Sequence, residues 1–323
     1  MLRIAFCIIS LAVLSMASIL IGSVDIPAGQ VFHVLAGGKA DKESWTYIIL
    51  ESRIPQTATA LLCGASLATS GLLLQTSFRN PLAGPSILGI SSGASLGVAI
   101  VTLLSGGILS AVAAAFGGAM AIIALLLIIS TIVRNNMILL IVGIMISYLT
   151  SSVVSLCNFF TNADNLQTFV FWGMGSFSDV GLQQLPVFSL CCILGLAVSV
   201  TMVKQLNAIL LGEKYAASLG VNIRRTRWLT LLSTGLLTAA STAFCGPIAF
   251  IGLAVPHIAR FLMGTSNHKY LLPATILCGA MIAVACNIIC VLPGSLIVPV
   301  NAITPIFGAP VIIYTLFIKK AKR

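Results

Sequence analysis

The chain has 323 residues, of which 59% are hydrophobic and only 7% are charged. Soluble domains carry about 25% charged residues, so this composition excludes an ordinary soluble domain and indicates a membrane protein. The net charge of +10 comes from scattered loop ends and the C-terminal tail. No basic patch is interleaved with aromatic residues, which argues against a nucleic-acid partner. The nine cysteines fall almost entirely in apolar runs without metal-ligand spacing, as small packing residues do.

Long apolar stretches divide the chain into ten predicted membrane spans, each near the about 20 residues that a helix needs to cross a bilayer. The predicted spans are 3–22, 53–78, 88–104, 108–133, 137–158, 185–203, 228–245, 248–262, 271–292 and 300–318. The first could instead be a cleaved signal peptide. Apolar residues continue after Ser15-Met16-Ala17, however, which makes a poor cleavage site and favours an uncleaved helix.

Charged residues predict the orientation of these spans. All Lys and Arg residues except Lys39, Lys42 and Arg53 fall on one side, and all Asp and Glu residues except Glu213 fall on the other. Positively charged loops are retained in the cytoplasm. The sequence therefore predicts an all-α polytopic protein of the bacterial inner (cytoplasmic) membrane, with about ten transmembrane helices and both termini in the cytoplasm.

Two spans end in matching breaks. Span 53–78 is followed by Asn80-Pro81-Leu82-Ala83-Gly84-Pro85, and span 228–245 is followed by Gly246-Pro247. The first of these spans opens outside and the second opens inside, as an inverted repeat requires. Interrupted segments in corresponding halves point to the substrate region of a transporter.

Small residues recur at four-residue spacing in span 88–104, at Gly89, Gly93 and Gly97. This spacing favours close helix packing over contact with a substrate. The same glycines create two Gly-x-Ser-x-Gly matches around Ser91 and Ser95, the pattern of a serine hydrolase. A nucleophile elbow needs a strand-to-helix turn and a nearby histidine, so an intramembrane hydrolase is the weaker hypothesis.

A second stripe consists of Ser147, Ser151 and Ser155, which share one face of a helix. It is either a packing face, with hydroxyls bonded back to the preceding turn, or a polar strip that lines a water-filled path. The residues by themselves leave both interpretations open.

The chain carries no phosphate-binding loop, and none of its spans holds a buried Asp, Glu or Lys that could couple transport to ions. A partner-independent channel or secondary carrier therefore fits less well than a transporter driven by a separate ATPase. Residues 212–220, in the longest basic loop, are expected to form a short amphiphilic helix that ends at Gly220. This helix is either a handle for the ATPase or an ordinary surface helix.

Several motifs occur in a fixed order from Arg53 to the C-terminal part of the chain. They are Arg53-Ile54-Pro55, Arg79-Asn80-Pro81-Leu82-Ala83, Ile87-Leu88-Gly89-Ile90-Ser91-Ser92-Gly93-Ala94, Gly246-Pro247-Ile248-Ala249-Phe250-Ile251-Gly252-Leu253, Pro256-His257-Ile258-Ala259-Arg260 and Gly308-Ala309-Pro310. On these motifs the chain resembles the FecCD-type permeases, the membrane subunits of ATP-binding-cassette (ABC) importers for iron chelates, haem and cobalamin.

The resemblance implies a type II ABC importer permease fold with an inverted repeat, formed by residues 1–323 as one transmembrane domain. It implies a second permease subunit, first of all a homodimer, with a cytoplasmic ABC ATPase dimer and a periplasmic substrate-binding protein. The chain itself would hold no cofactor or metal and would catalyse no reaction. An iron chelate (siderophore) is the first expectation for the cargo, with cobalamin or haem as alternatives.

The resemblance also implies roles for individual residues. The residues expected to couple to the ATPase are Gly212, Glu213, Ala216, Leu219 and Gly220. Ser147, Ser151 and Ser155 would line the pathway at the dimer axis, and Arg53 would dock the binding protein.

The chain departs from the family pattern at its outer surface. The departures are Gln56 in place of an Arg, Cys286 and Cys290 in place of an Asp and an Arg, Ile297 (outside the residues that the structure describes) in place of a Glu, and Asn301 in place of a Gly. The two cysteines lie one helical turn apart, which suits apolar replacement better than a disulfide. With Arg53 as the one matching arginine, the binding protein is expected to dock differently, through Lys39, Lys42 and the acidic outer loop.

Overall fold

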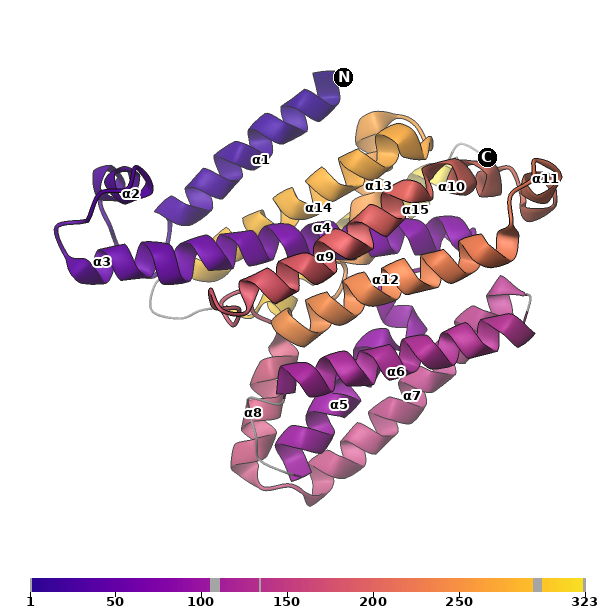
Figure 1. Ribbon diagram of the computed structural model, residues 1–323, viewed down its shortest axis with the longest axis horizontal. Coiled ribbons are helices and arrows are strands. Elements are labelled where there is room, and N and C mark those ends of the chain that lie inside the picture. The colour runs from indigo at the N-terminus through magenta and orange to yellow at the C-terminus, as the bar shows by residue number, and fades with distance from the viewer. Residues whose placement is uncertain (1, 105–110, 134, 293–297, 322–323) are drawn as a thin grey trace.

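The computed structural model describes residues 2–104, 111–133, 135–292 and 298–321, and the regular structure in these ranges is helical throughout. In chain order (Figure 1) the elements are α1 (Leu2–Leu20), α2 (Ala28–Leu35), α3 (Glu43–Tyr47), the π-helix η1 (Ile48–Arg53), α4 (Ile54–Ser77), the 3-10 helix η2 (Pro85–Leu88), α5 (Ile90–Leu104), α6 (Ala111–Ile132), α7 (Asn136–Phe160), α8 (Ala163–Met174), α9 (Leu185–Thr201), α10 (Val203–Leu210), α11 (Glu213–Ser218), α12 (Ile223–Cys245), α13 (Ile251–Met263), α14 (His268–Val291) and α15 (Val300–Ala321). The predicted inner charges Arg134, Lys322 and Arg323 lie outside the described residues.

The described helices account for the predicted spans. Six are long and apolar enough to cross a membrane, and α9 with α10, bent by 54°, can form a seventh crossing. Three shorter apolar helices, α5, α13 and α15, fall on the remaining predicted spans. The all-α polytopic fold is confirmed. Helix α8 was not predicted: it lies between the predicted spans 137–158 and 185–203, and it begins where Asn162 accepts a hydrogen bond from the Asn165 N–H.

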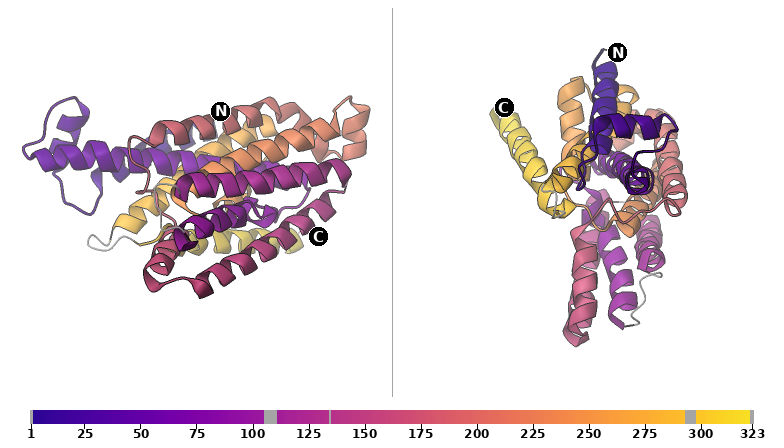
Figure 2. Two further views of the ribbon diagram at one scale, coloured as in Figure 1. Left: turned by 60° about the horizontal axis from the view of Figure 1, so that its bottom comes forward. Right: turned by 90° about the vertical axis from the view of Figure 1, so that its left-hand side faces the viewer.

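Helix α4 is the centre of the molecule. In an apolar 18-residue segment of the helical stretch Glu43–Ser77, which contains α4, 83% is buried inside the chain. In the corresponding segment of α7 the buried share is 17%. It packs against α9, α12, α13 and α14. Helix α7 runs along one edge, and α15 diverges from the bundle at another (Figure 2). Both edge helices therefore leave apolar surface for lipid or for a second subunit.

The packing follows the predicted inverted repeat. Helix α4 packs against α13 and α14 of the second half, and α12 packs against α5 and α6 of the first half. Each short helix also packs against its successor, α5 against α6 and α13 against α14. The edge helices correspond as well, because α7 packs against α5 and α15 packs against α13. Exchanging helices α4–α7 with helices α12–α15 therefore reproduces this set of contacts.

The glycine stripe of α5 is a packing surface. A Cβ atom on Gly93 would lie 2.7 Å from the carbonyl oxygen of Gly118, and one on Gly97 would lie 2.1 Å from that of Ala114. Both glycines therefore let α5 approach α6 to backbone contact. Gly89 has a φ of +78° and ends η2 beside α7, in a conformation that glycine adopts without steric cost.

Candidate functional site

The segment 212–220 forms the short helix that the sequence predicts. Gly212 precedes α11 with a φ of +120°, and Gly220 follows it with a φ of +82°. The Gly220 N–H donates to the Ala217 carbonyl and the Val221 N–H to the Ala216 carbonyl, each at 3.0 Å. This pair of bonds is the Schellman arrangement that satisfies the last carbonyls of a helix. Two glycines thus set both ends of α11.

Helix α11 has one packed side and one exposed side. Ala216 is fully buried, and α11 packs against its neighbours α10 and α12. Tyr215 and Leu219, by contrast, are 53% and 58% exposed. Exposed large apolar side chains on a helix that is otherwise anchored are typical of a protein-binding surface. This arrangement suits a helix that a partner subunit grips from outside.

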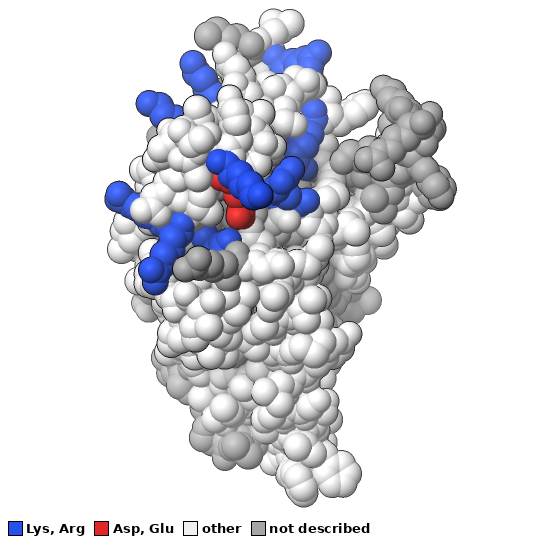
Figure 3. Space-filling model, turned by 90° about the vertical axis from the view of Figure 1, so that its right-hand side faces the viewer, with Lys and Arg blue, Asp and Glu red and all other residues white. Residues whose placement is uncertain are grey.

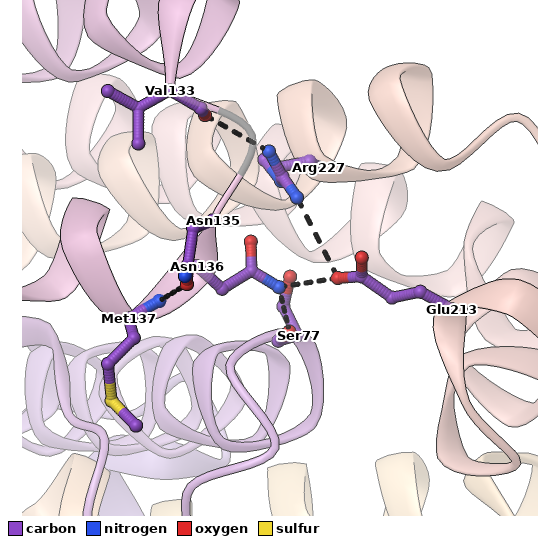
Figure 4. Close-up of polar contacts among 7 residues, drawn as sticks. All are labelled: Ser77, Val133, Asn135, Asn136, Met137, Glu213 and Arg227. Atoms are coloured by element: carbon purple, nitrogen blue, oxygen red, sulfur yellow. Dashed lines mark hydrogen bonds and ion pairs between the residues drawn. The ribbon is translucent and has the colours of Figure 1, made fainter.

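Glu213 opens α11 and turns part of its carboxylate toward the body of the protein (Figure 4). Its Oε1 accepts a hydrogen bond of 2.6 Å from Asn136 Nδ2 and lies 3.7 Å from Arg227 Nη2. The Arg227 side chain is 11% exposed, and that of Glu213 is 37% exposed. Arg227 Nη1 also donates to the Val133 carbonyl at 3.3 Å. A carboxylate bonded in this way is held in one orientation.

Asn136 is the point where three helices meet. It is the first residue of α7, and its Nδ2 also donates to the Ser77 carbonyl at the end of α4, at 3.0 Å. The preceding residue, Asn135, caps α7 by accepting a 2.8 Å bond from the Met137 N–H. The sequence analysis did not identify Asn136. An Asn pair before an apolar run signals a helix start, but the partners of its side chain come from other parts of the chain.

A groove of about 810 Å³ lies beside α11. The residues that line it are Phe78, Arg79, Asn80, Pro81, Asn135, Asn136, Met137, Leu140, Leu211, Gly212, Glu213, Lys214 and Tyr215. Figure 3 shows Lys and Arg side chains gathered over this end of the molecule around a small acidic area. The groove, α11 and these cations make this end, here called the basic end, the candidate surface for a partner.

Arg79 takes a strained conformation at the mouth of this groove. Its φ of 48° lies in the left-handed region, where the cost for a residue other than glycine is about 1–2 kcal/mol. It occupies the position after α4 that usually holds glycine, with its N–H bonded to the Thr76 carbonyl. A backbone role alone would favour glycine here. Strained residues other than glycine cluster at functional sites, which makes Arg79 a candidate functional residue of this groove.

Three motif residues join α13 to the end of α4. Arg260 Nη1 donates to Gln75 Oε1 at 2.7 Å, and Gln75 Nε2 donates to the Leu253 carbonyl at 3.1 Å. The ring of His257 lies 2.8 Å from the Pro81 carbonyl. These bonds connect α13 of the second half to the end of α4 and to the break that follows it. The motifs that carry the family resemblance are thus in contact at the basic end.

The serine stripe lies on α7 as predicted. Ser147 donates to the Gly143 carbonyl at 3.0 Å, and Ser155 donates to the Ser151 carbonyl at 2.9 Å. Ser147 is half-buried beside Gly89, whereas Ser151 and Ser155 are exposed on the edge of the chain. The hydroxyls bond back to the preceding turn, yet the outer part of the stripe faces away from the bundle. None of the three serines lines the groove beside α11 that is described above.

The geometry does not support a serine hydrolase. Ser91 lies in α5, and its hydroxyl is 3.3 Å from that of Thr242 on α12. His268 bonds to Thr76 and Asn207 instead, both at 2.9 Å. A nucleophile elbow requires a strand-to-helix turn, and Ser91 follows a 3-10 helix. The Gly-x-Ser-x-Gly matches are by-products of the glycine stripe.

Arg53, the residue expected to dock the binding protein, is bonded within its own chain. The residue is only 4% exposed, and its Nη1 donates to the carbonyls of Ile19 and Leu20 at 2.9 and 2.8 Å. Its Nη2 donates to the Val24 carbonyl. Arg53 therefore caps the last turn of α1, where carbonyl groups lack helical partners. The docking role of Arg53 stays a prediction, and the burial of its side chain between α1 and η1 argues against it.

Asn301 and Gln56, two departures from the family pattern, have structural roles. Asn301 Oδ1 accepts from the Ala249 N–H at 3.0 Å, and its Nδ2 donates to the carbonyls of Gly173 (3.2 Å) and Pro247. Gln56 Nε2 donates to Asn287 Oδ1 at 2.9 Å between α4 and α14. These side chains bind segments of the same chain together.

Within the described ranges, no group of three His, Cys, Asp or Glu side chains could hold a metal ion.

Comparison with known proteins decides the family. The model of the FecCD transport family matches residues 10–318. The chain belongs to this family. It is accordingly the permease of an ABC importer, a multi-pass membrane protein whose ATPase resides in a partner chain.

Relatives within the FecCD family differ in cargo. The chain is 31% identical to the molybdate import system permease MolB of Haemophilus influenzae, over 93% of this chain and 90% of MolB. It is 32% identical to the vitamin B12 import system permease BtuC of Vibrio parahaemolyticus, over 95% of this chain and 93% of BtuC. A solved structure assigned provisionally to the metal-chelate type of ABC transporter, in an inward-facing conformation, matches with a TM-score of 0.86 and 29% identity, covering 98% of both chains.

Proposed function

We propose that this chain is the permease through which an ABC importer moves an iron chelate of the siderophore type across the bacterial inner membrane. The observation that carries the coupling part of the proposal is α11, a helix fixed by two glycines that exposes Tyr215 and Leu219 beside the groove at the basic end. An ATPase bound there would act on Gly212, Glu213, Ala216, Leu219 and Gly220. The charge pattern supports a cytoplasmic location for this end and for both termini.

The assembly in this proposal contains two copies of the chain, an ABC ATPase dimer and a periplasmic substrate-binding protein. The support for a homodimer is the uncovered face of α7. Only 17% of an apolar 18-residue segment of this helix is buried inside the chain. Ser151 and Ser155 on this face, with Ser147, would then line a path between two copies. A wide path with weak hydroxyl contacts suits a bulky cargo, because tight contacts would retain it. The permease acts as one transmembrane domain without a cofactor of its own.

The binding protein would meet the outer segment that contains α2 and α3. Lys39 and Lys42 are exposed there, next to the exposed carboxylates of Asp41 and Glu43. Charges of both signs on a docking surface set the register and rate of association more than its affinity. This surface replaces Arg53 in the proposal, because Arg53 is buried.

The cargo assignment rests on the metal-chelate description of the structural neighbour. Cobalamin, haem and molybdate are the alternatives, and the names of BtuC and MolB favour cobalamin and molybdate. Uptake into vesicles tests the choice, with the permease, its ATPase and its binding protein reconstituted together. We expect ATP-dependent accumulation of a labelled ferric chelate. Accumulation of cobalamin, haem or molybdate would assign that compound as the cargo instead. Uptake without ATP would contradict the mechanism.

A further inference from the structure

We infer that Glu213 transmits movement of α11 to α7 and does not serve as a docking residue for the ATPase. This inference rests on the proposed function and adds to it the route by which the ATPase would act on the pathway. In this route, Asn136 passes the movement to the helix that carries Ser147, Ser151 and Ser155. Arg227 keeps the Glu213 carboxylate in position.

The two sides of α11 have separate tasks. The large apolar side chains available to a partner are Tyr215 and Leu219, which are both more than half exposed. The Glu213 carboxylate already has a partner in Asn136 at 2.6 Å and a cation, Arg227, at 3.7 Å. Glu213 Oε1 makes both interactions, so an ATPase that drew this side chain away from the bundle would break both of them. Binding to the exposed side chains of Tyr215 and Leu219 leaves both Glu213 interactions intact.

The bonded groups connect α11 to helices that are distant from it in the sequence. Along the chain α11 packs against α10 and α12, and the Asn136–Glu213 hydrogen bond extends this contact to α7. Arg227 of α12 adds a connection to the end of α6 through the Val133 carbonyl. A displacement of α11 therefore acts on the first turn of α7. Figure 4 shows these side chains converging from separate ribbons.

The two helices that Asn136 connects, α4 and α7, differ in how much of their surface is buried. Asn136 bonds at once to Glu213 and to the Ser77 carbonyl at the end of α4. Helix α4 is enclosed by four other helices, whereas α7 lies at the edge with little of its surface buried. A pull on Asn136 will therefore displace α7 more easily than α4. Edge elements with few buried contacts are the ones that move at low cost.

Three variants in the full transport complex test the route. Glu213→Ala removes both interactions, and Asn136→Asp places one carboxylate against another. The double variant Asn136→Asp with Glu213→Gln restores a hydrogen bond with donor and acceptor exchanged. Asp164→Ala is the matched control for the loss of a carboxylate, because Asp164 is an exposed acidic residue in the first turn of α8, away from the basic end. Leu219→Asp is the control for docking, because it charges the exposed apolar side of α11.

Two quantities are measured for each variant: retention of the ATPase during purification, and cargo transported per ATP hydrolysed. We expect Glu213→Ala and Asn136→Asp to retain the ATPase and to lower the transport ratio at least about tenfold, a factor equal to roughly 1.4 kcal/mol of coupling. The double variant should recover part of the ratio, because it restores the bond between positions 136 and 213 but not the bond to the Ser77 carbonyl. Leu219→Asp should lose the ATPase, and Asp164→Ala should resemble the wild type.

Three results would overturn the inference. The first is loss of the ATPase from Glu213→Ala, which would make Glu213 a docking residue. The second is a normal transport ratio in Glu213→Ala, and the third is a double variant no better than Asn136→Asp. Hydrogen exchange over α7 after ATP addition separates this inference from the proposed function. If the wild-type complex carries none of the four cargoes, an ATP-dependent change in α7 that Glu213→Ala abolishes still supports the route, and its persistence in that variant contradicts it.

Discussion

Gly71 of α4 lies so close to Gly252 of α13 that a Cβ atom on Gly71 would be 1.6 Å from the Gly252 carbonyl oxygen. The contact joins the central helix of the first half of the repeat to the short helix of the second half. Without side chains at either position, the two backbones pack directly, as small residues allow in membrane proteins. Gly252 also leaves no space for a Cβ, since Pro85 Cδ would be 2.8 Å away.

Gly71→Ala is expected to destabilise the permease severely. The clashing atoms are backbone, which cannot rotate away, so the loss should exceed the about 1–3 kcal/mol that is usual for overpacking. Thermal unfolding in detergent measures it. Gly117→Ala is the matched control, because Gly117 is also helical and has no atom within 4 Å of the position of a Cβ. Equal stability of the two variants would contradict the close contact.

Arg79→Gly should separate stability from function. Glycine adopts the φ of 48° without the strain that an arginine bears, so the variant should be as stable as the wild type or more stable by about 1 kcal/mol. Arg79 lines the groove at the basic end, and its loss should reduce ATP-driven uptake. Thermal unfolding and vesicle uptake test the two parts. A clear drop in stability would show that Arg79 is a structural residue.

Arg53→Met should weaken the attachment of α1. Methionine retains much of the apolar stem but leaves the Ile19, Leu20 and Val24 carbonyls without their donor. Hydrogen bonds from a charged group contribute about 1.5–3 kcal/mol, so we expect a stability loss of this order. Affinity for the substrate-binding protein should change little. Normal stability with reduced affinity would instead restore Arg53 to a docking role.

Asn301→Ala should loosen the junction of α8, α13 and α15. The Ala249 N–H and the Gly173 carbonyl lose their partner, and a buried group left unsatisfied costs about 1–3 kcal/mol. Thermal unfolding should show a loss of about 2 kcal/mol, while Gln183→Ala, at an exposed amide, should show none. No difference between the two variants would mean that these backbone groups are satisfied without Asn301.

Much of the architecture could be predicted from the sequence, because the signals involved are local. A bilayer requires long apolar helices, so composition alone located the ten spans to within a few residues of the observed helices. Helix α11 was predictable for a similar reason: Gly220 ends it through bonds to residues only a few positions away. The broken spans likewise predicted an inverted repeat, which the packing of α4 and α12 reproduces.

The roles of individual polar side chains required the tertiary structure. The sequence predicts that Arg53 is an outward-facing cation. Only the packing of α1 beside η1 shows that it is buried and caps the C-terminal end of α1. Asn136 reads as a helix start, and its bond to Glu213 joins residues 77 positions apart. A hydrogen bond depends on atoms meeting within about 3 Å, which a linear pattern does not encode. Hydropathy and capping act along the chain, whereas the partner of a polar side chain is decided by which helices the packed core brings together.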